Sequence, residues 1–477
     1  MNKTTTLLIA LTLGCTLSAQ NLKKSVTWEN ICAHPASLPV VGQLKTAASD
    51  LNRPSLWSVG CETMDRDYAD FEKFKQYVGL TGVGYARLQS GWAKTEKKKG
   101  KYDFSWLDKH VDGLLAQGVH PWICLCYGNP VYSNHGYDLD AKLFPDGPIM
   151  DAWLKYVEAA VKHFKGRVTM YEVWNEPDNS KALDSYDLYA NLFVRTAKVI
   201  RDIDPDVKIA AFASCSPDRK YIRQSMKKIA EMDGIKYMDC LTYHAYWPIP
   251  EYVTPAVKRL RSDVDAYSKD IRLLQGETGC PGQLEYGHAM CNIEWNEYSQ
   301  VKWDLRNMIN HFGMGVPYSI FTMVDLNYGW MLQSYGLVRM NLKSEPQYLR
   351  PKFYAVQNAV NLFTADLAPA GDVSVESSCG RKIQCVGIRK DGKNVGCALW
   401  FCDERPTDSL EREKVSVSIK GVDFENPVYI DVLSGKVHSL PQFMNNGSIT
   451  EDCVNISSLP LWDCPIVLMN SKCVKFE

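Results

Sequence analysis

Short apolar runs alternate with amphipathic stretches from about residue 56 to residue 325, and this alternation constrains the fold more than any other feature. The runs have the length and residue types of strands, and the stretches between them carry apolar residues at helical spacing. The candidate strands are Leu56–Glu62, Gly84–Gln89, His120–Tyr127, Thr169–Asn175, Val207–Ala213, Met238–Ala245, Ile271–Gly276 and Val316–Met323. Eight strands that alternate with helices predict an α/β fold, a closed (β/α)8 TIM barrel. A doubly wound open sheet is the structural alternative.

The pattern changes after Phe363, where strand-like runs follow one another without helices. The runs lie at 372–375, 382–388, 395–401, 415–419, 428–433 and 466–469, with turn signals such as Asp391-Gly392 between them. A series of strands of this kind predicts a small C-terminal β-sandwich. We therefore expect a barrel over 51–362 and an accessory sandwich over 363–477, which braces the barrel or binds sugar. Residues 20–50 receive no assignment.

The N-terminus has the features of a secretory signal peptide over residues 1–19. Lys3 precedes an apolar run from Leu7 to Leu13, and small residues up to Ala19 offer a cleavage site. A lipid anchor on Cys15 is the less favoured alternative, because Thr12 stands where a leucine is usually found. No run reaches the roughly 20 apolar residues that span a bilayer. We expect a secreted or periplasmic protein without a transmembrane segment.

Charge and cysteine usage exclude several classes of partner. The formal net charge is −1, and no basic run is present, which argues against nucleic acid as a ligand. The 16 cysteines are spread thinly, and no CxxC pair or His/Cys cluster has metal-ligand spacing. Cys124 and Cys126 are expected to be buried core thiols. We predict no metal and no cofactor.

Polar residues gather at the ends of the candidate strands, which meet at one mouth of a barrel. The fourth strand ends at Glu176, the seventh at Glu277, and the sixth at His244 and Tyr246. Hydrolysis of a glycosidic bond with retention needs two carboxyl groups about 5–5.5 Å apart. Because the fourth and seventh strands lie across the mouth from each other, the two glutamates can meet over a bound sugar.

Two other acids compete for these roles. Glu172 shares a strand face with Glu176. At about 3.3 Å per residue it should lie roughly 13 Å deeper toward the barrel floor, as a buried structural acid. Glu62, at the end of the first strand, lacks a matching motif and is expected to be an exposed loop or substrate contact.

The segment Trp174-Asn175-Glu176-Pro177, paired with Glu277, resembles the catalytic motifs of glycoside hydrolase clan A. The segment Tyr102-Asp-Phe-Ser-Trp-Leu-Asp108 is similar to parts of families 39 and 42. Two sandwich segments, at 428–435 and 459–462, resemble the sandwich appended to family 39-like barrels. The resemblance covers the whole barrel.

The resemblance implies a role for each acid. Glu277 would be the nucleophile, and Arg87 would hold it ionised, because an opposite charge within about 4–6 Å lowers a carboxyl pKa. Glu176 would be the acid/base, kept protonated near neutral pH by its proximity to Glu277.

The resemblance also implies residues that bind or orient. Asn175 would hydrogen-bond the sugar 2-hydroxyl, and Tyr246 or His244 would orient Glu277, with Tyr246 favoured. Trp330 is the best candidate for an aromatic sugar platform. The other rim aromatics are Trp92, Trp247 and Tyr328.

These residues predict a retaining glycosidase that cleaves β-linked oligo- or polysaccharides by double displacement. A barrel that binds glycan without cleaving it is the alternative, although intact glutamates at both positions argue against it. A phosphate-handling barrel is disfavoured, because no Gly-rich turn precedes a helix near the last two strands.

Overall fold

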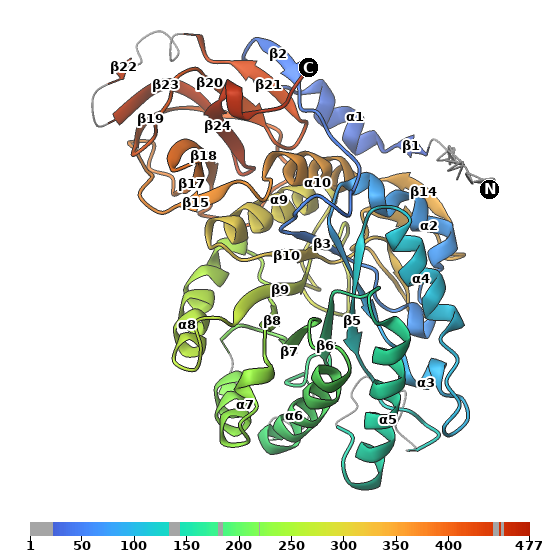
Figure 1. Cartoon of the computed structure of the whole chain (residues 1–477). Helices are drawn as coiled ribbons and strands as arrows, with labels where there is room; N and C mark the ends of the chain where they lie inside the picture. Colours follow the sequence, from blue (N-terminus) through green and yellow to red (C-terminus); the bar gives the residue numbers. More distant parts are fainter. Residues whose placement is uncertain (1–21, 133–143, 180–184, 219, 442–447, 450–452) are drawn as a thin grey trace, which may run out of the picture.

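The computed structural model describes residues 22–132, 144–179, 185–218, 220–441, 448–449 and 453–477 (Figure 1). The predicted signal peptide and Cys15 lie outside these residues. A barrel ringed by helices occupies most of the chain, and the C-terminal strands pack at one end of it. Among the described helices, none is both long enough and apolar enough to cross a membrane.

The barrel is closed and parallel, which confirms the predicted TIM barrel and excludes the open sheet. Its strands are β3 (Trp57–Gly60), β4 (Tyr85–Gln89), β5 (His120–Leu125), β6 (Met170–Val173), β7 (Lys208–Ser214), β8 (Cys240–His244), β9 (Arg272–Thr278) and β10 (Tyr318–Ile320). They follow one another around the barrel, and β10 pairs with both β9 and β3, which closes the ring.

Helices cover the outside of the barrel, as expected for a strand-helix repeat. They are α2 (Phe71–Val78), α3 (Trp92–Thr95), α4 (Ser105–Leu115), α5 (Gly147–Phe164), α6 (Tyr186–Ile203), α7 (Lys220–Glu231), α8 (Thr254–Asp265), α9 (Glu297–Gly313) and α10 (Pro351–Leu362). Short 3-10 turns are η1 (Met64–Arg66), η2 (Gly79–Thr81), η3 (Ile235–Tyr237) and η4 (Pro250–Val253). Helix α10 was not predicted from the sequence, because it is buried on nearly all sides and shows no amphipathic stripe.

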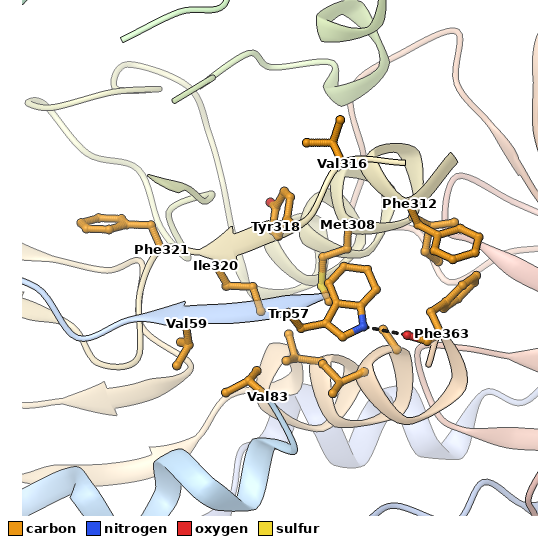
Figure 2. Close-up of a cluster of buried hydrophobic side chains, with 14 of the residues drawn as sticks. Trp57, Val59, Val83, Met308, Phe312, Val316, Tyr318, Ile320, Phe321 and Phe363 are labelled. Carbon is orange, nitrogen blue, oxygen red and sulfur yellow. Dashed lines mark hydrogen bonds between the residues drawn. The ribbon is translucent and has the colours of Figure 1, made fainter. Parts of the chain in front are cut away.

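A cluster of apolar side chains packs where the first and last barrel strands meet (Figure 2). Trp57 of β3 lies at its centre beside Met308 and Phe312 of α9, and its indole donates a hydrogen bond to the Phe363 carbonyl oxygen at 2.8 Å. This contact joins the closing seam of the barrel to the end of α10. On β5, Cys124 is fully buried, as predicted for a core thiol.

The C-terminal part is a two-sheet β-sandwich, as predicted. One sheet has the order β15-β17-β18-β24-β20-β21-β2 and the other β16-β19-β23-β22. The strands are β15 (Ala368–Ala370), β16 (Ser374–Ser377), β17 (Ile383–Lys390), β18 (Lys393–Phe401), β19 (Glu413–Lys420), β20 (Pro427–Asp431), β21 (Lys436–Ser439), β22 (Ser448–Ile449), β23 (Cys453–Leu461) and β24 (Ile466–Asn470), followed by η6 (Ser471–Cys473).

The segment without an assignment from sequence contributes to both parts. It contains β1 (Lys23–Lys24), α1 (Val26–Ala33) and β2 (Val40–Gln43). Strand β2 pairs with β21 at the edge of the larger sandwich sheet, and the C-terminus lies beside β2 in Figure 1. Strand β1 pairs with β14 (Pro346–Leu349), which also pairs with β13 (Val338–Met340).

Candidate active site

A pocket of about 640 Å³ opens at the carboxyl ends of the barrel strands. It is lined by Glu176 and Glu277 together with residues from the loops after β3, β4, β5, β7, β8, β9 and β10. A cavity of about 760 Å³ lies elsewhere, between α8, α9 and the sandwich, at the amino ends of β9 and β10. Among the described residues that line this second cavity none is acidic, so the chemistry belongs to the first pocket.

The two predicted glutamates meet in this pocket. Glu176 follows β6 and Glu277 lies within β9, and one oxygen of each lies within 4.8 Å of the other and of a ring nitrogen of His244. Their side chains are 20% and 13% exposed, so both carboxyls reach the pocket from a largely buried position. This separation fits a pair of carboxyl groups that act on the two atoms of one glycosidic bond.

A backbone turn after β6 places Glu176 at the rim. Trp174 has φ 69° and Glu176 has φ 46°, both in the left-handed region that non-glycine residues rarely adopt. The Glu176 amide donates to the Ala213 oxygen at 3.0 Å, and the buried Trp174 ring packs against Trp153, which together hold the turn. Glu172 lies earlier in the chain, within β6 itself. Glu172 is buried as predicted, but it shares Arg87 with the pocket.

Arg87 is fully buried beneath the pocket and binds four side chains. Its guanidinium donates to Glu172 Oε2 at 3.0 and 2.5 Å, to Glu277 Oε2 at 2.8 Å and to Asn175 Oδ1 at 2.8 Å, with Glu62 Oε1 at 3.4 Å. Burial lowers the pKa of Arg87, but the surrounding carboxylates outweigh it and raise the pKa well above its usual value. The ion pair with Glu277 is the one expected from the sequence.

Glu62 is not the exposed contact that the sequence suggested. Its side chain is 1% exposed and folds back over Gly60, where a Cβ would lie 2.0 Å from Glu62 Oε2. A residue with a side chain at position 60 would therefore displace the carboxyl. Burial raises the pKa of Glu62 from 4.5 to about 7, with Arg87 opposing the rise and Glu277 adding to it.

Tyr246 and His244 hold different carboxyls. The Tyr246 hydroxyl donates to Glu277 Oε1 at 2.7 Å, as favoured from the sequence. His244 Nδ1 lies 2.9 Å from Glu176 Oε1 and 3.8 Å from Glu277 Oε1, so the expectation that His244 orients Glu277 is wrong. The imidazole contacts the acid/base candidate. Glu176 and Glu277 come from strands on either side of β8, so spacing along the chain could not show which of them His244 contacts.

The charge of His244 also changes the expected protonation of Glu176. Burial raises the pKa of Glu176, but hydrogen bonds from His244 and Asn179 outweigh it and leave the pKa below its usual value. Burial lowers the pKa of His244, but the charges of Glu277 and Glu176 outweigh it and raise the pKa. In the free site the shared proton therefore resides on His244, and the prediction that proximity to Glu277 keeps Glu176 protonated is wrong.

Asn175 lies between Arg87 and Tyr127 and bonds both. Its side-chain oxygen accepts from Arg87, and its amide nitrogen donates to the Tyr127 hydroxyl at 2.8 Å, leaving a second N–H for a ligand. Neither Tyr127 nor Asn179 was predicted from the sequence, and the Asn179 side-chain amide donates to Glu176 Oε2 at 2.7 Å. Asn179 stands three residues after Glu176, and this spacing was the available signal.

The trio Glu176, His244 and Glu277 could also hold a metal ion, since their ligand atoms cluster. Sequence spacing did not reveal this group, because each member comes from a different strand. The Arg87 guanidinium, 2.8 Å from Glu277, already supplies the positive charge there. The arrangement therefore suits proton transfer and nucleophilic attack better than binding of a cation.

The predicted rim aromatics divide into three groups. Trp247 and Tyr328 line the pocket. Trp92 is fully buried, and its indole donates to Glu96 Oε2 at 2.6 Å, so its placement at the rim was wrong. Trp330 lies outside the pocket lining, and its ring stacks on His288 with centroids 5.5 Å apart.

Comparisons with known proteins agree with this geometry. Residues 69–263 match the model of the Glycosyl hydrolases family 39. A β-xylosidase of Geobacillus stearothermophilus is 26% identical over 30% of this chain and 31% of its own, so the match spans about a third of that relative.

Two solved structures share the fold. A family 39 glycoside hydrolase from the gut symbiont Bacteroides cellulosilyticus WH2 has a TM-score of 0.64 at 16% identity, covering 89% of this chain and 82% of that one. A monomeric β-xylosidase from Caulobacter crescentus CB15 has a TM-score of 0.56 at 15% identity, covering 91% and 98%. Motifs, family match and fold thus agree that this chain resembles the clan A glycoside hydrolases, and family 39 among them.

Proposed function

We propose that this protein is a retaining β-glycosidase in which Glu277 is the nucleophile and Glu176 the acid/base. The observation that carries the proposal is the separation of their carboxyl oxygens, which lie within 4.8 Å of each other. Retaining enzymes hold the two carboxyls about 5–5.5 Å apart, whereas inverting enzymes leave about 6.5–9.5 Å for a water molecule.

In the first step Glu277 attacks the anomeric carbon and the bond to the leaving oxygen breaks. Arg87 and Tyr246 hold the two carboxylate oxygens of Glu277, so the nucleophile is held in one orientation. The leaving oxygen takes a proton from Glu176. That proton reaches Glu176 from His244 along their 2.9 Å hydrogen bond.

In the second step water attacks the glycosyl-enzyme ester. Glu176, now ionised, accepts a proton from the water, and the bond between the sugar and Glu277 breaks. The pair Glu176–His244 suits both steps, because it holds one proton and returns it between turnovers. The free N–H of Asn175 is positioned for a sugar hydroxyl, a contact that strengthens as charge develops on the ring.

The substrate class follows from the relatives and from the lining of the pocket. Two of the similar proteins are β-xylosidases, so β-linked xylosides are the first substrates to examine. A barrel that binds glycan without cleaving it is the competing function. The ionised pair at Arg87 and the proton held at His244 favour catalysis, since binding alone requires neither.

The two glutamates are separated by an azide experiment. Glu277→Ala removes the nucleophile, so the loss should be severe on every substrate, and azide should then give the α-glycosyl azide. Glu176→Ala loses the roughly 10²–10⁴-fold that general acid–base catalysis contributes, but it should still form the intermediate from a dinitrophenyl glycoside, and azide should release it as the β-azide.

Proton NMR of the products distinguishes the outcomes. Exchange of the two azide configurations would reverse the roles of the glutamates. Full activity in both variants would show that the site is wrong, and sugar binding without turnover in the wild type would establish the competing function.

A further inference from the structure

Four aromatic rings pack one after another and form a column between the pocket and the surface. Tyr68 packs on Tyr328 with centroids 4.4 Å apart, Tyr328 on His288 at 4.5 Å, and His288 on Trp330 at 5.5 Å and 21°. Tyr328 and His288 line the pocket, whereas Trp330 is 68% exposed. The column, defined as these four rings, thus ends in a large aromatic side chain at the rim.

Trp330 is held with one face covered and the other free. A Cβ on Gly287 would lie 2.8 Å from the Trp330 ring, so the absence of a side chain at position 287 lets the ring lie flat against the loop. His288 covers the same inner side. Tyr286, which precedes Gly287, is 80% exposed. An exposed ring fixed in place loses little conformational entropy when a ligand stacks on it.

The hairpin that carries Trp330 is itself anchored. Trp330 stands between β11 (Leu326–Asn327) and β12 (Leu332–Gln333). The Asn327 backbone amide donates to the Tyr68 carbonyl oxygen at 2.8 Å. The Asn327 side chain accepts from the Gly329 amide at 2.9 Å and donates to the Leu342 carbonyl oxygen at 2.9 Å. The tip therefore has a defined position relative to the pocket.

The position of the column around the barrel gives it a direction. The hairpin follows β10, which lies four places from β6 in the ring of eight strands, directly across the mouth from Glu176. The leaving group must contact Glu176, since this residue protonates the leaving oxygen. Sugar units that extend toward Trp330 therefore belong to the other, non-reducing side of the cleaved bond.

We propose that Trp330, supported by the column, binds a sugar unit on the non-reducing side of the residue that is cleaved. This inference rests on the proposed function and refines it: the substrate is a β-linked oligosaccharide with at least one further sugar before the scissile bond, and the first product is at least a disaccharide.

The chemistry of the column matches an uncharged sugar. Burial lowers the pKa of His288, so the imidazole is neutral at pH 7 and the stacked rings carry no charge. The C–H groups on the face of a pyranose pack on an indole ring without a charged partner.

The test compares two aryl glycosides of one sugar, the β-xyloside and the β-xylotrioside, in the wild type and in Trp330→Ala. We expect the ratio of kcat/KM for the trioside to that for the xyloside to fall about tenfold in Trp330→Ala, equivalent to about 1.4 kcal/mol. Trp330→Phe should recover part of the ratio, and Gly287→Ala, which displaces the ring without removing it, should lower it. Tyr267→Ala, an exposed tyrosine that follows α8 at the amino-end face, is the matched control and should leave the ratio unchanged.

The outcomes separate the inference from the proposed function. Wild-type cleavage with the same ratio in Trp330→Ala, or xylose as the first product from xylohexaose, would overturn the inference alone. A change in oligomeric mass in Trp330→Ala with an unchanged ratio would identify the surface as a protein interface and also overturn it. No turnover of any aryl β-glycoside by the wild type would overturn the proposed function, and the inference with it.

Discussion

Replacement of Glu62 by glutamine tests the electrostatics of the site through stability. Burial raises the pKa of Glu62 from 4.5 to about 7, so between these values the folded protein holds a proton that the unfolded chain releases. Stability therefore falls as pH rises through this window. Since a tenfold change in proton affinity is about 1.4 kcal/mol, the loss is about 3 kcal/mol by pH 8.

Glu62→Gln keeps the shape of the side chain and cannot ionise. The difference in unfolding free energy between Glu62→Gln and the wild type should therefore move by about 3 kcal/mol in favour of the variant between pH 4.5 and pH 8. Titrating groups that do not interact with Glu62 cancel, because both proteins contain them. Any pH-independent effect of the lost contact with Arg87 also cancels in this difference.

Urea unfolding followed by tryptophan fluorescence at pH 4.5, 6 and 8 measures the effect as a change in midpoint at constant slope. Glu411→Gln, which alters an exposed carboxylate of the sandwich, is the control and should show a difference that is flat with pH. A flat difference for Glu62→Gln as well, or one that grows toward low pH, would refute the assignment of a raised pKa to Glu62.

Three further substitutions test the contacts around the two catalytic candidates. Tyr246→Phe removes the hydroxyl that holds the nucleophile, and because hydrogen bonds to charged groups contribute about 1.5–3 kcal/mol, kcat/KM should fall roughly 10- to 100-fold with the melting temperature nearly unchanged. Arg87→Met leaves buried carboxylates without their cation and should destabilise the fold by about 3–5 kcal/mol in urea unfolding, against less than about 1 kcal/mol for Arg195→Met in an exposed pair. The pKa of His244 is raised above 6.5, so its proton is held below that pKa and lost as pH rises through it. The alkaline limb of kcat/KM should therefore lie above pH 6.5 in the wild type and move to lower pH in His244→Asn, and an unmoved limb would show that His244 does not supply the proton of Glu176.

Features that depend on neighbouring residues could be predicted from the sequence, and features that depend on residues far apart in the chain could not. Strand and helix periodicity is local, so the eight strands and the order in which they surround the barrel could be predicted from residues 56–325 alone. The convergence of Glu176 and Glu277 followed from that order, because strand ends in a parallel barrel share one mouth. Six strands of the sandwich were also predicted from alternation and turn residues, whereas β15, β21, β22 and β23 were not.

Other features depended on residues far apart in the chain. The pairing of β2 with β21 joins segments separated by most of the sequence, and the apolar content of β2 is too slight to predict it. Glu172, Glu62 and Glu277 converge on Arg87 although they come from or directly follow three different strands, which spacing along the chain does not show. No local pattern in the sequence predicts either feature.

The sequence by itself determined the barrel, the sandwich and the two carboxyl groups that meet at the mouth. Only the tertiary structure decided whether Glu62 and Glu176 hold a proton. His244 proved to be the partner of Glu176, and Glu62 proved to be buried beside Arg87. The physical reason is that a pKa depends on desolvation and on charges a few ångströms away, and the side chains that supply them here come from different strands of the barrel.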